Sequence, residues 1–149
     1  MKIIAMFCVL FAGTIATTQA QTTVSDADKV AITQTALDYL EGWYAADGER
    51  MERALHPELA KRIMRTNAQG QSRLEQMGAM TLVQYTKRGG GKNTAKDKQQ
   101  KEVTILDVFG NTASVKAVAA DWVDYLHVAK SNGKWVIVNV LWEMKPKKQ

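Results

Sequence analysis

The Asn132-Gly133 dipeptide constrains the fold of this chain more than any other feature of its sequence. Both residues tolerate a positive φ, as a two-residue hairpin turn requires, and the segments on either side are rich in β-branched and aromatic residues. Gly110-Asn111 offers a second turn of the same length. Together the two turns predict an antiparallel meander with strands at 102–109, 112–120, 122–130 and 134–143.

Helical periodicity dominates the first half of the chain. Ser25 is a predicted N-cap, because Asp28 follows three residues later and apolar residues then recur at spacings of three and four. The pattern predicts helices from Ser25 to about Ala46, at 49–55 and at 74–85, with a short strand or turn at 60–66. Helices followed by a meander make one α+β domain over 25–145, with the N-terminal helices packed on a curved antiparallel sheet.

The first twenty residues have the pattern of a signal peptide. Lys2 precedes an apolar run at 3–15, and Thr18 and Ala20 are small residues at the positions that a signal peptidase reads. The run is shorter than the roughly 20 residues of a membrane-spanning helix. We therefore expect a cleavable signal peptide at 1–20 and a periplasmic or secreted protein with no membrane partner after cleavage.

Composition narrows the possible chemistry. The only cysteine, Cys8, lies in the apolar run, so we expect neither disulfides nor thiolate metal sites in the mature chain. The net charge is +5, but an exported protein does not meet nucleic acid, so we expect no such partner. Two histidines without spaced carboxylates make no metal motif. Gly89-Gly90-Gly91 lacks the wider P-loop spacing and indicates a mobile loop instead of a phosphate site. From these patterns together we expect no cofactor and no metal.

The hairpin turn also predicts which side chains share a face of the sheet. Counting outward from it gives the pairs Ser131–Lys134, Val128–Ile137, Leu126–Asn139, Asp124–Leu141 and Trp122–Glu143. The face that carries Trp122, Asp124 and Asn139 mixes apolar and polar groups, as small-molecule sites do, although a wet sheet rim would show the same mixture. The opposite face is also largely apolar, and we expect a second copy to cover it in a homodimer.

Four segments resemble the signatures of the putative lumazine-binding family, part of the nuclear-transport-factor-2-like (SnoaL-like) superfamily. They are YLEGWY at 39–44, MERALHPELAKR at 51–62, DWVDYLH at 121–127 and GKWVIVNVLW at 133–142. The resemblance extends from about Val30 to Glu143. It implies a cone of helices over a strongly bent sheet, with a pocket between them and often a dimer. The superfamily holds binding modules, isomerases, dehydratases and cyclases, so the resemblance selects no single function.

Three residues are candidate catalytic groups. A buried Asp124 would act as a general base, His56 as an acid–base group or a helix-end cap, and Tyr39 as a hydroxyl donor or a core aromatic. The candidate ligand-binding residues are Trp43, Trp122, Asn139, Trp135 and Tyr85. Three functions stay open: a binding domain for a flat or apolar small molecule, an acid–base enzyme of isomerase, dehydratase or cyclase type, and a dimeric scaffold without ligand. We favour the first, because no catalytic constellation stands out.

Overall fold

The structure is a computed structural model that describes residues 24–146, so the signal peptide expected at 1–20 lies outside the described residues. Its elements are, in order, α1 (Asp26–Ala45), α2 (Gly48–Ala54), β1 (Leu55–Thr66), β2 (Ser72–Met77), α3 (Ala79–Lys87), the 3-10 turn η1 (Lys96–Lys98), β3 (Glu102–Phe109), β4 (Thr112–Val118), β5 (Trp122–Ser131) and β6 (Lys134–Met144). None of the helices in 24–146 has the length and apolar character needed to cross a bilayer.

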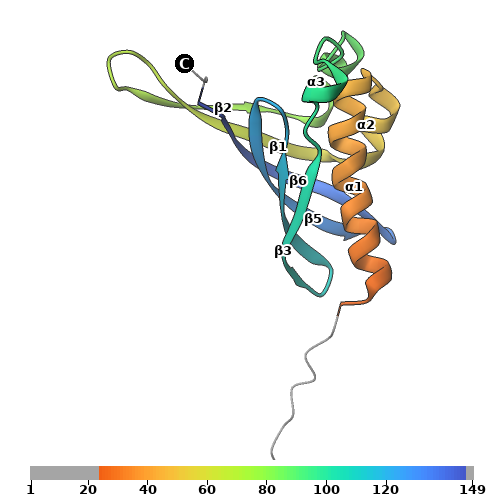
Figure 1. The fold of residues 1–149 in the computed structure, drawn as a ribbon. Coiled ribbons are helices and arrows are strands. Elements are labelled where there is room, and N and C mark those ends of the chain that lie inside the picture. Colours follow the sequence, from red (N-terminus) through yellow and green to blue (C-terminus); the bar gives the residue numbers. More distant parts are fainter. Residues whose placement is uncertain (1–23, 147–149) are drawn as a thin grey trace, which may run out of the picture.

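The six strands form one sheet in the order β2-β1-β6-β5-β4-β3. Neighbouring strands are antiparallel except β1 and β6, which run parallel. Figure 1 shows α1 lying along one face of the curved sheet, with α2 and α3 at one end of it. The predicted α+β cone is therefore confirmed, with one difference. The sheet is mixed, because β1 from the N-terminal half adds to it alongside the last strand.

The start of α1 follows the predicted capping pattern. The Ser25 hydroxyl accepts a hydrogen bond from the Asp28 backbone N–H at 3.1 Å. The helix ends where Ala46 takes a left-handed conformation with φ of 56°. Ile32, Ala36 and Leu40 have no exposed surface and anchor α1 to the sheet. This packing brings Tyr39, which lies between them in the sequence, against the sheet as well.

The helix predicted at 74–85 is wrong over its first third. The chain forms β2 there, and α3 begins only at Ala79, after Gly78 in an extended conformation with φ of −94° and ψ of 176°. Leu74 and Met77 have helical spacing, but in β2 they lie on opposite faces, as residues three apart in a strand do. Pairing with β1, which is a full strand of 12 residues, decides the outcome over local periodicity.

The last hairpin has the predicted turn, and Val128 pairs with Ile137 as expected. The next pair is His127 with Asn139, so Val138 is an extra residue on β6. Such a bulge changes the register of everything beyond it. Because side chains alternate along a strand, every later β6 side chain moves to the face opposite the predicted one.

This shift corrects the predicted pairs. Asp124 lies opposite Trp142 instead of Leu141, and Trp122 lies opposite Met144. Trp142 therefore joins the face that carries Asp124 and that the helices cover. Leu141 moves to the helix-free face, where it is 53% exposed.

Candidate functional site

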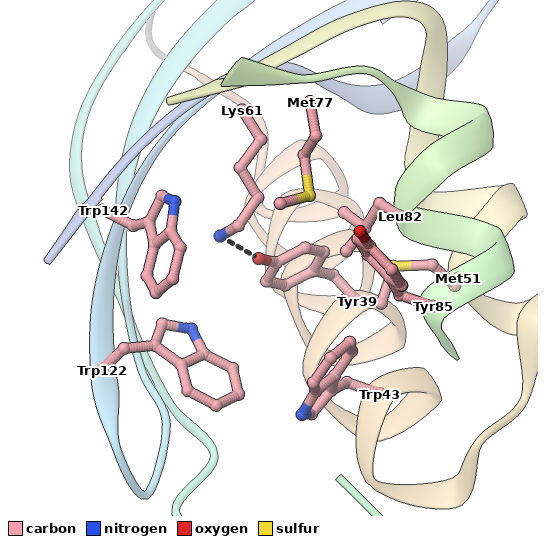
Figure 2. A pocket seen from close by; sticks show the side chains of 9 residues that line it. All are labelled: Tyr39, Trp43, Met51, Lys61, Met77, Leu82, Tyr85, Trp122 and Trp142. Atoms are coloured by element: carbon pink, nitrogen blue, oxygen red, sulfur yellow. Dashed lines mark hydrogen bonds between the residues drawn. The ribbon is translucent and has the colours of Figure 1, made fainter. Parts of the chain in front are cut away.

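A cavity of about 90 Å³ lies between α1, α2, α3 and the sheet. Figure 2 shows its walls, which are aromatic, aliphatic or thioether groups except for one ammonium group. The lining residues are Tyr39, Trp43, Met51, Lys61, Met77, Leu82, Tyr85, Trp122 and Trp142. Lys61 is the charged residue of this set. As far as residues 24–146 form it, the cavity is therefore an apolar chamber with a single cation in its wall.

Opposite sides of the cavity carry two facing tryptophans. Tyr39 and Trp43 project from α1 four residues apart, so they lie on the same side of the helix. Trp122 faces them from the start of β5, and its ring meets Trp43 edge-on at a centroid distance of 5.8 Å and an angle of 86°. This edge-to-face arrangement is a favourable aromatic geometry that holds both indoles in place.

The glycine triplet after α3 supports the Trp43 wall. The Gly91 N–H donates to the Trp43 carbonyl at 2.9 Å. A Cβ at Gly91 would lie 2.6 Å from the Trp43 indole, and one at Gly90 would lie 2.6 Å from the Trp43 carbonyl oxygen. Only glycine allows so close an approach. The sequence suggested a mobile loop, whereas the structure packs this part of it against the cavity wall.

The cation belongs to a buried hydrogen-bonded cluster that we call the cavity cluster: Lys61, Asp124, Tyr39 and Trp122. Lys61 Nζ forms an ion pair with Asp124 Oδ1 and donates to the Tyr39 hydroxyl at 2.8 Å. The Tyr39 hydroxyl and Trp122 Nε1 donate to Asp124 Oδ2 at 3.2 and 2.5 Å. Asp124 is 0% exposed and Lys61 is 5% exposed. Asp124 thus lies behind Lys61, enclosed by its three donors.

Burial sets the protonation of the cluster. Burial lowers the pKa of the Lys61 ammonium, and the negative charge of Asp124 offsets only part of that effect. Burial also raises the pKa of the Tyr39 phenol well above its ordinary value, and the charge of Asp124 adds to the shift. Tyr39 is therefore a neutral hydroxyl, and Lys61 is closer to its neutral amine form than an exposed lysine.

The structure brings five of the predicted site residues together. Tyr39, Trp43, Tyr85 and Trp122 line the cavity, and Asp124 holds the lysine in its wall. Tyr85 is 46% exposed and lies where the cavity meets solvent. Asp124, predicted as a buried base in a concave wall, is indeed buried, but it has no accessible surface and does not line the cavity itself.

Asn139 and Trp135 are not part of this group. The bulge at Val138 turns Asn139 to the helix-free face, where its side-chain oxygen accepts from Arg62 at 2.7 Å. Trp135 keeps its predicted face but lies near the start of α1, where its Nε1 donates to Asp28 Oδ1 at 2.8 Å. The predicted register placed Asn139 wrongly by one residue, and the predicted face alone did not show how far along the strand Trp135 lies from the cavity.

His56 also lies outside the cavity. It is the second residue of β1, and its Nδ1 accepts from the Glu58 backbone N–H at 3.1 Å. This is a local contact across Pro57, and none of the cavity-lining residues is a histidine. Within the described residues, no group of three His, Cys, Asp or Glu side chains lies close enough to hold a metal ion.

Lys61, the charged residue of the cavity lining, was not among the predicted site residues. Leu59 and Ile63, both 3% exposed, flank it at the two-residue spacing of a strand, so alternation alone assigns Lys61 to the buried face. Treating 60–66 as a short strand or turn hid that signal. Trp142 was also assigned to the wrong face, and its buried Nε1 has no hydrogen-bond partner in the described chain.

Comparison with known proteins places the chain among structures of the same shape. An NTF2-like protein of unknown function from Shewanella baltica OS155 is 20% identical, with 85% of this chain and all (100%) of that chain covered at a TM-score of 0.64. An NTF2-like protein from Methylobacillus flagellatus KT is 23% identical, with 85% and 98% covered and a TM-score of 0.63. A Nostoc punctiforme PCC 73102 protein with a cystatin-like fold is 16% identical, with 83% and 96% covered and a TM-score of 0.59.

At these identities the similar structures show the fold alone. A search of curated proteins finds no match. The sequence profile of one family, described as putative lumazine-binding, matches residues 27–143. That match includes the three helices except for Asp26, the first residue of α1, and all but the last residue of the sheet. The chain therefore belongs to the putative lumazine-binding family.

Proposed function

We propose that the domain binds a small, flat, largely apolar molecule in the cavity described above. The observation that carries the proposal is a chamber to which the described residues contribute three tryptophans, two tyrosines and one charged group, Lys61. Aromatic walls with few polar groups are typical of small-molecule sites, and flat rings stack on such walls. The family description, which names lumazine, agrees with a planar ligand.

The volume of the cavity limits the size of the ligand. At about 90 Å³ it is smaller than the cavity of about 150 Å³ that holds benzene in another protein. The half-exposed Tyr85 marks the open side, where part of a ligand can remain outside. We therefore propose that a single ring enters the chamber and that any second ring or substituent lies against Tyr85.

The ligand should also carry a hydrogen-bond acceptor. Within residues 24–146, the buried Trp142 Nε1 has no hydrogen-bond partner, and Lys61 Nζ lies 4.5 Å from the centre of the Trp142 ring. A buried donor without an acceptor costs about 1–3 kcal/mol, which a ligand oxygen would recover. The proposed ligand is thus a ring with a carbonyl, hydroxyl or carboxylate oxygen near the Lys61 end.

Tryptophan fluorescence tests the proposal directly, because Trp43, Trp122 and Trp142 line the cavity. We expect a saturable change with benzyl alcohol, a single-ring probe, and a weaker one with lumazine, whose two fused rings exceed the chamber. Met77→Phe should fill the cavity and weaken binding about tenfold, a loss of about 1.4 kcal/mol. Met80→Phe is the matched control, since Met80 is 68% exposed on α3.

Two results would contradict this function. One is the absence of any saturable change with both probes. The other is equal affinity in the Met77→Phe and Met80→Phe variants, which would place binding elsewhere. Native mass spectrometry of the mature protein adds an independent measurement, because it shows whether a small molecule is retained through purification.

We also propose that the protein is exported and that it forms a homodimer. The expected signal peptide supports export, and the exposed apolar residues on the helix-free face of the sheet support a homodimer. On that face Tyr125 and Leu141 pair across β5 and β6 and are 50% and 53% exposed. Sedimentation at micromolar concentration should give a dimer that Leu141→Lys converts to monomer. A monomeric wild-type protein would remove the dimer from the proposal.

A further inference from the structure

We propose that Lys61 is a nucleophile that captures small aldehydes and ketones as a Schiff base inside the cavity. This inference rests on the proposed function, because the cavity must first admit the carbonyl compound. It goes further by naming the ligand class and the atom that bonds to it.

The position of Lys61 favours this chemistry. Its Nζ points into the space between Trp142, Trp122 and Tyr39, as Figure 2 shows. The nitrogen lies 4.5 Å from the centroid of Trp142 and 5.5 Å from that of Tyr39. Burial favours the neutral amine, which is the form that attacks a carbonyl carbon, whereas Asp124 and the aromatic faces favour the ammonium from which that amine is released. An aromatic ring held by these walls would present its carbonyl group to Nζ as a near neighbour.

The other members of the cavity cluster supply the proton transfers. Asp124 Oδ1 is paired with the ammonium and can take one proton from it, which leaves a neutral amine and a neutral carboxyl. The amine nitrogen then bonds to the carbonyl carbon while its second proton passes to the carbonyl oxygen, giving a carbinolamine. The Asp124 carboxyl returns its proton to that hydroxyl, the C–O bond breaks, and water leaves. The product is an iminium ion paired with the Asp124 carboxylate.

Tyr39 and Trp142 complete the arrangement. The Tyr39 hydroxyl already contacts both Lys61 Nζ and Asp124, so it lies along the path of the proton. The buried Trp142 Nε1, which has no acceptor among the described residues, would donate to the carbonyl oxygen. The reaction conserves charge, since one cation next to Asp124 is replaced by another. The reaction therefore buries no additional charge in the cavity.

Lys130 shows what a lysine of similar pairing looks like outside the cavity. Its Nζ forms an ion pair with Asp28 Oδ1 at 2.8 Å, but its side chain is 33% exposed. It is absent from the cavity lining. Lys130 is thus a control with the same residue type and the same kind of partner, but with no enclosed site for a ring.

The experiment uses the mature protein, benzaldehyde and sodium cyanoborohydride, which reduces an imine to a stable benzylamine. Intact mass spectrometry should show one added benzyl group, and peptide mapping should place it on Lys61. Because the bound ring is held next to the amine, labelling of Lys61 should be roughly tenfold faster than that of exposed lysines. Lys61→Arg should abolish the fast label, and Lys130→Arg should leave it unchanged.

Benzyl alcohol separates the two proposals, since it has the same ring but no electrophilic carbon. If it binds and benzaldehyde labels Lys61 no faster than other lysines, the nucleophile is wrong and the binding function stands. If benzyl alcohol and lumazine both fail to bind, and no site is labelled selectively, both proposals fall. Should Lys61→Arg not fold, the labelled position in the wild-type map still decides the question.

Discussion

Two regions of this molecule combine an aspartate, a lysine and a tryptophan, but the effect on the charged groups differs between them. In the cavity cluster, Asp124 accepts hydrogen bonds from Lys61 and from a tryptophan, Trp122. At the start of α1, Asp28 accepts from Lys130 and Trp135, each at 2.8 Å; we call these three residues the N-terminal cluster. The Asp124 side chain is 0% exposed and that of Asp28 is 25% exposed.

Burial is the difference between the clusters, and it reverses the effect on the charged groups. At the N-terminal cluster, hydrogen bonds from Lys130, Trp135 and Ser25 lower the pKa of Asp28 to about 2, so the folded state favours the carboxylate. In the cavity cluster, burial lowers the pKa of Lys61, so the folded state disfavours the ammonium. The first arrangement stabilises a helix start; the second keeps a strained charge beside an apolar chamber, as functional sites often do.

The largest test of this contrast is Asp124→Asn. The variant leaves the Lys61 ammonium buried without its counter-charge, and breaking a buried pair in this way costs about 3–5 kcal/mol. We expect the free energy of unfolding in urea to fall by that amount. Asp28→Asn is the matched change at the N-terminal cluster and should cause a much smaller loss, since water screens that site. Equal losses of unfolding free energy in the two variants would show that burial does not distinguish the two clusters.

Removing both charges sharpens the same comparison. Lys61→Met with Asp124→Leu replaces the pair by apolar side chains, and such replacements are often neutral or stabilising. Tyr39 and Trp122 lose their acceptor, at about 1 kcal/mol each. We therefore expect the double variant to be about 2 kcal/mol less stable than wild type, and more stable than either single variant. Additive losses in this double-mutant cycle would show that the two side chains do not interact.

The features that were predicted correctly from the sequence are those that depend on a short local segment. The Ser25 cap and the Asn132-Gly133 turn depend on a few adjacent residues, and both are present in the structure. The bulge at Val138 has no such local signal, because an alternating apolar strand reads the same in either register. Yet that bulge decides that Trp142 lines the cavity and that Asn139 does not.

The cavity cluster could not be predicted from the sequence, because its members also depend on pairing between distant segments. Its members come from α1, β1 and β5, and β1 joins the sheet only through its parallel pairing with β6. Asp124 was predicted to lie on the face that mixes apolar and polar groups, but no ion-pair partner was predicted for it. Alternation of Leu59, Lys61 and Ile63 was the available signal, and it carries weight only once 55–66 is recognised as a full strand.

Gly91→Ala should affect the cavity cluster through its aromatic wall while leaving the N-terminal cluster unchanged. The added methyl group would lie 2.6 Å from the Trp43 indole, so the indole must shift. Overpacking of this kind costs about 1–3 kcal/mol, and we expect weaker benzyl alcohol binding as well as lower stability. Gly78→Ala is the control, since its nearest contact would be 3.7 Å away. Unchanged binding in Gly91→Ala would show that Trp43 does not shape the site.

The smallest expected effect is the acid response of the N-terminal cluster. The pKa of Asp28 falls from 3.8 to about 2 on folding, so between these values the unfolded chain binds a proton that the folded chain does not. Stability from this group is therefore complete above pH 3.8 and is lost as the pH falls to about 2. In Asp28→Asn, the decline in the urea midpoint across this interval should be shallower than in wild type. Asp26→Asn is the control, because its side chain is 97% exposed beside the same helix start. An identical decline in wild type and Asp28→Asn would mean that the hydrogen bonds to Asp28 do not lower the pKa of its carboxyl group. The two clusters would then differ in burial without differing in electrostatics.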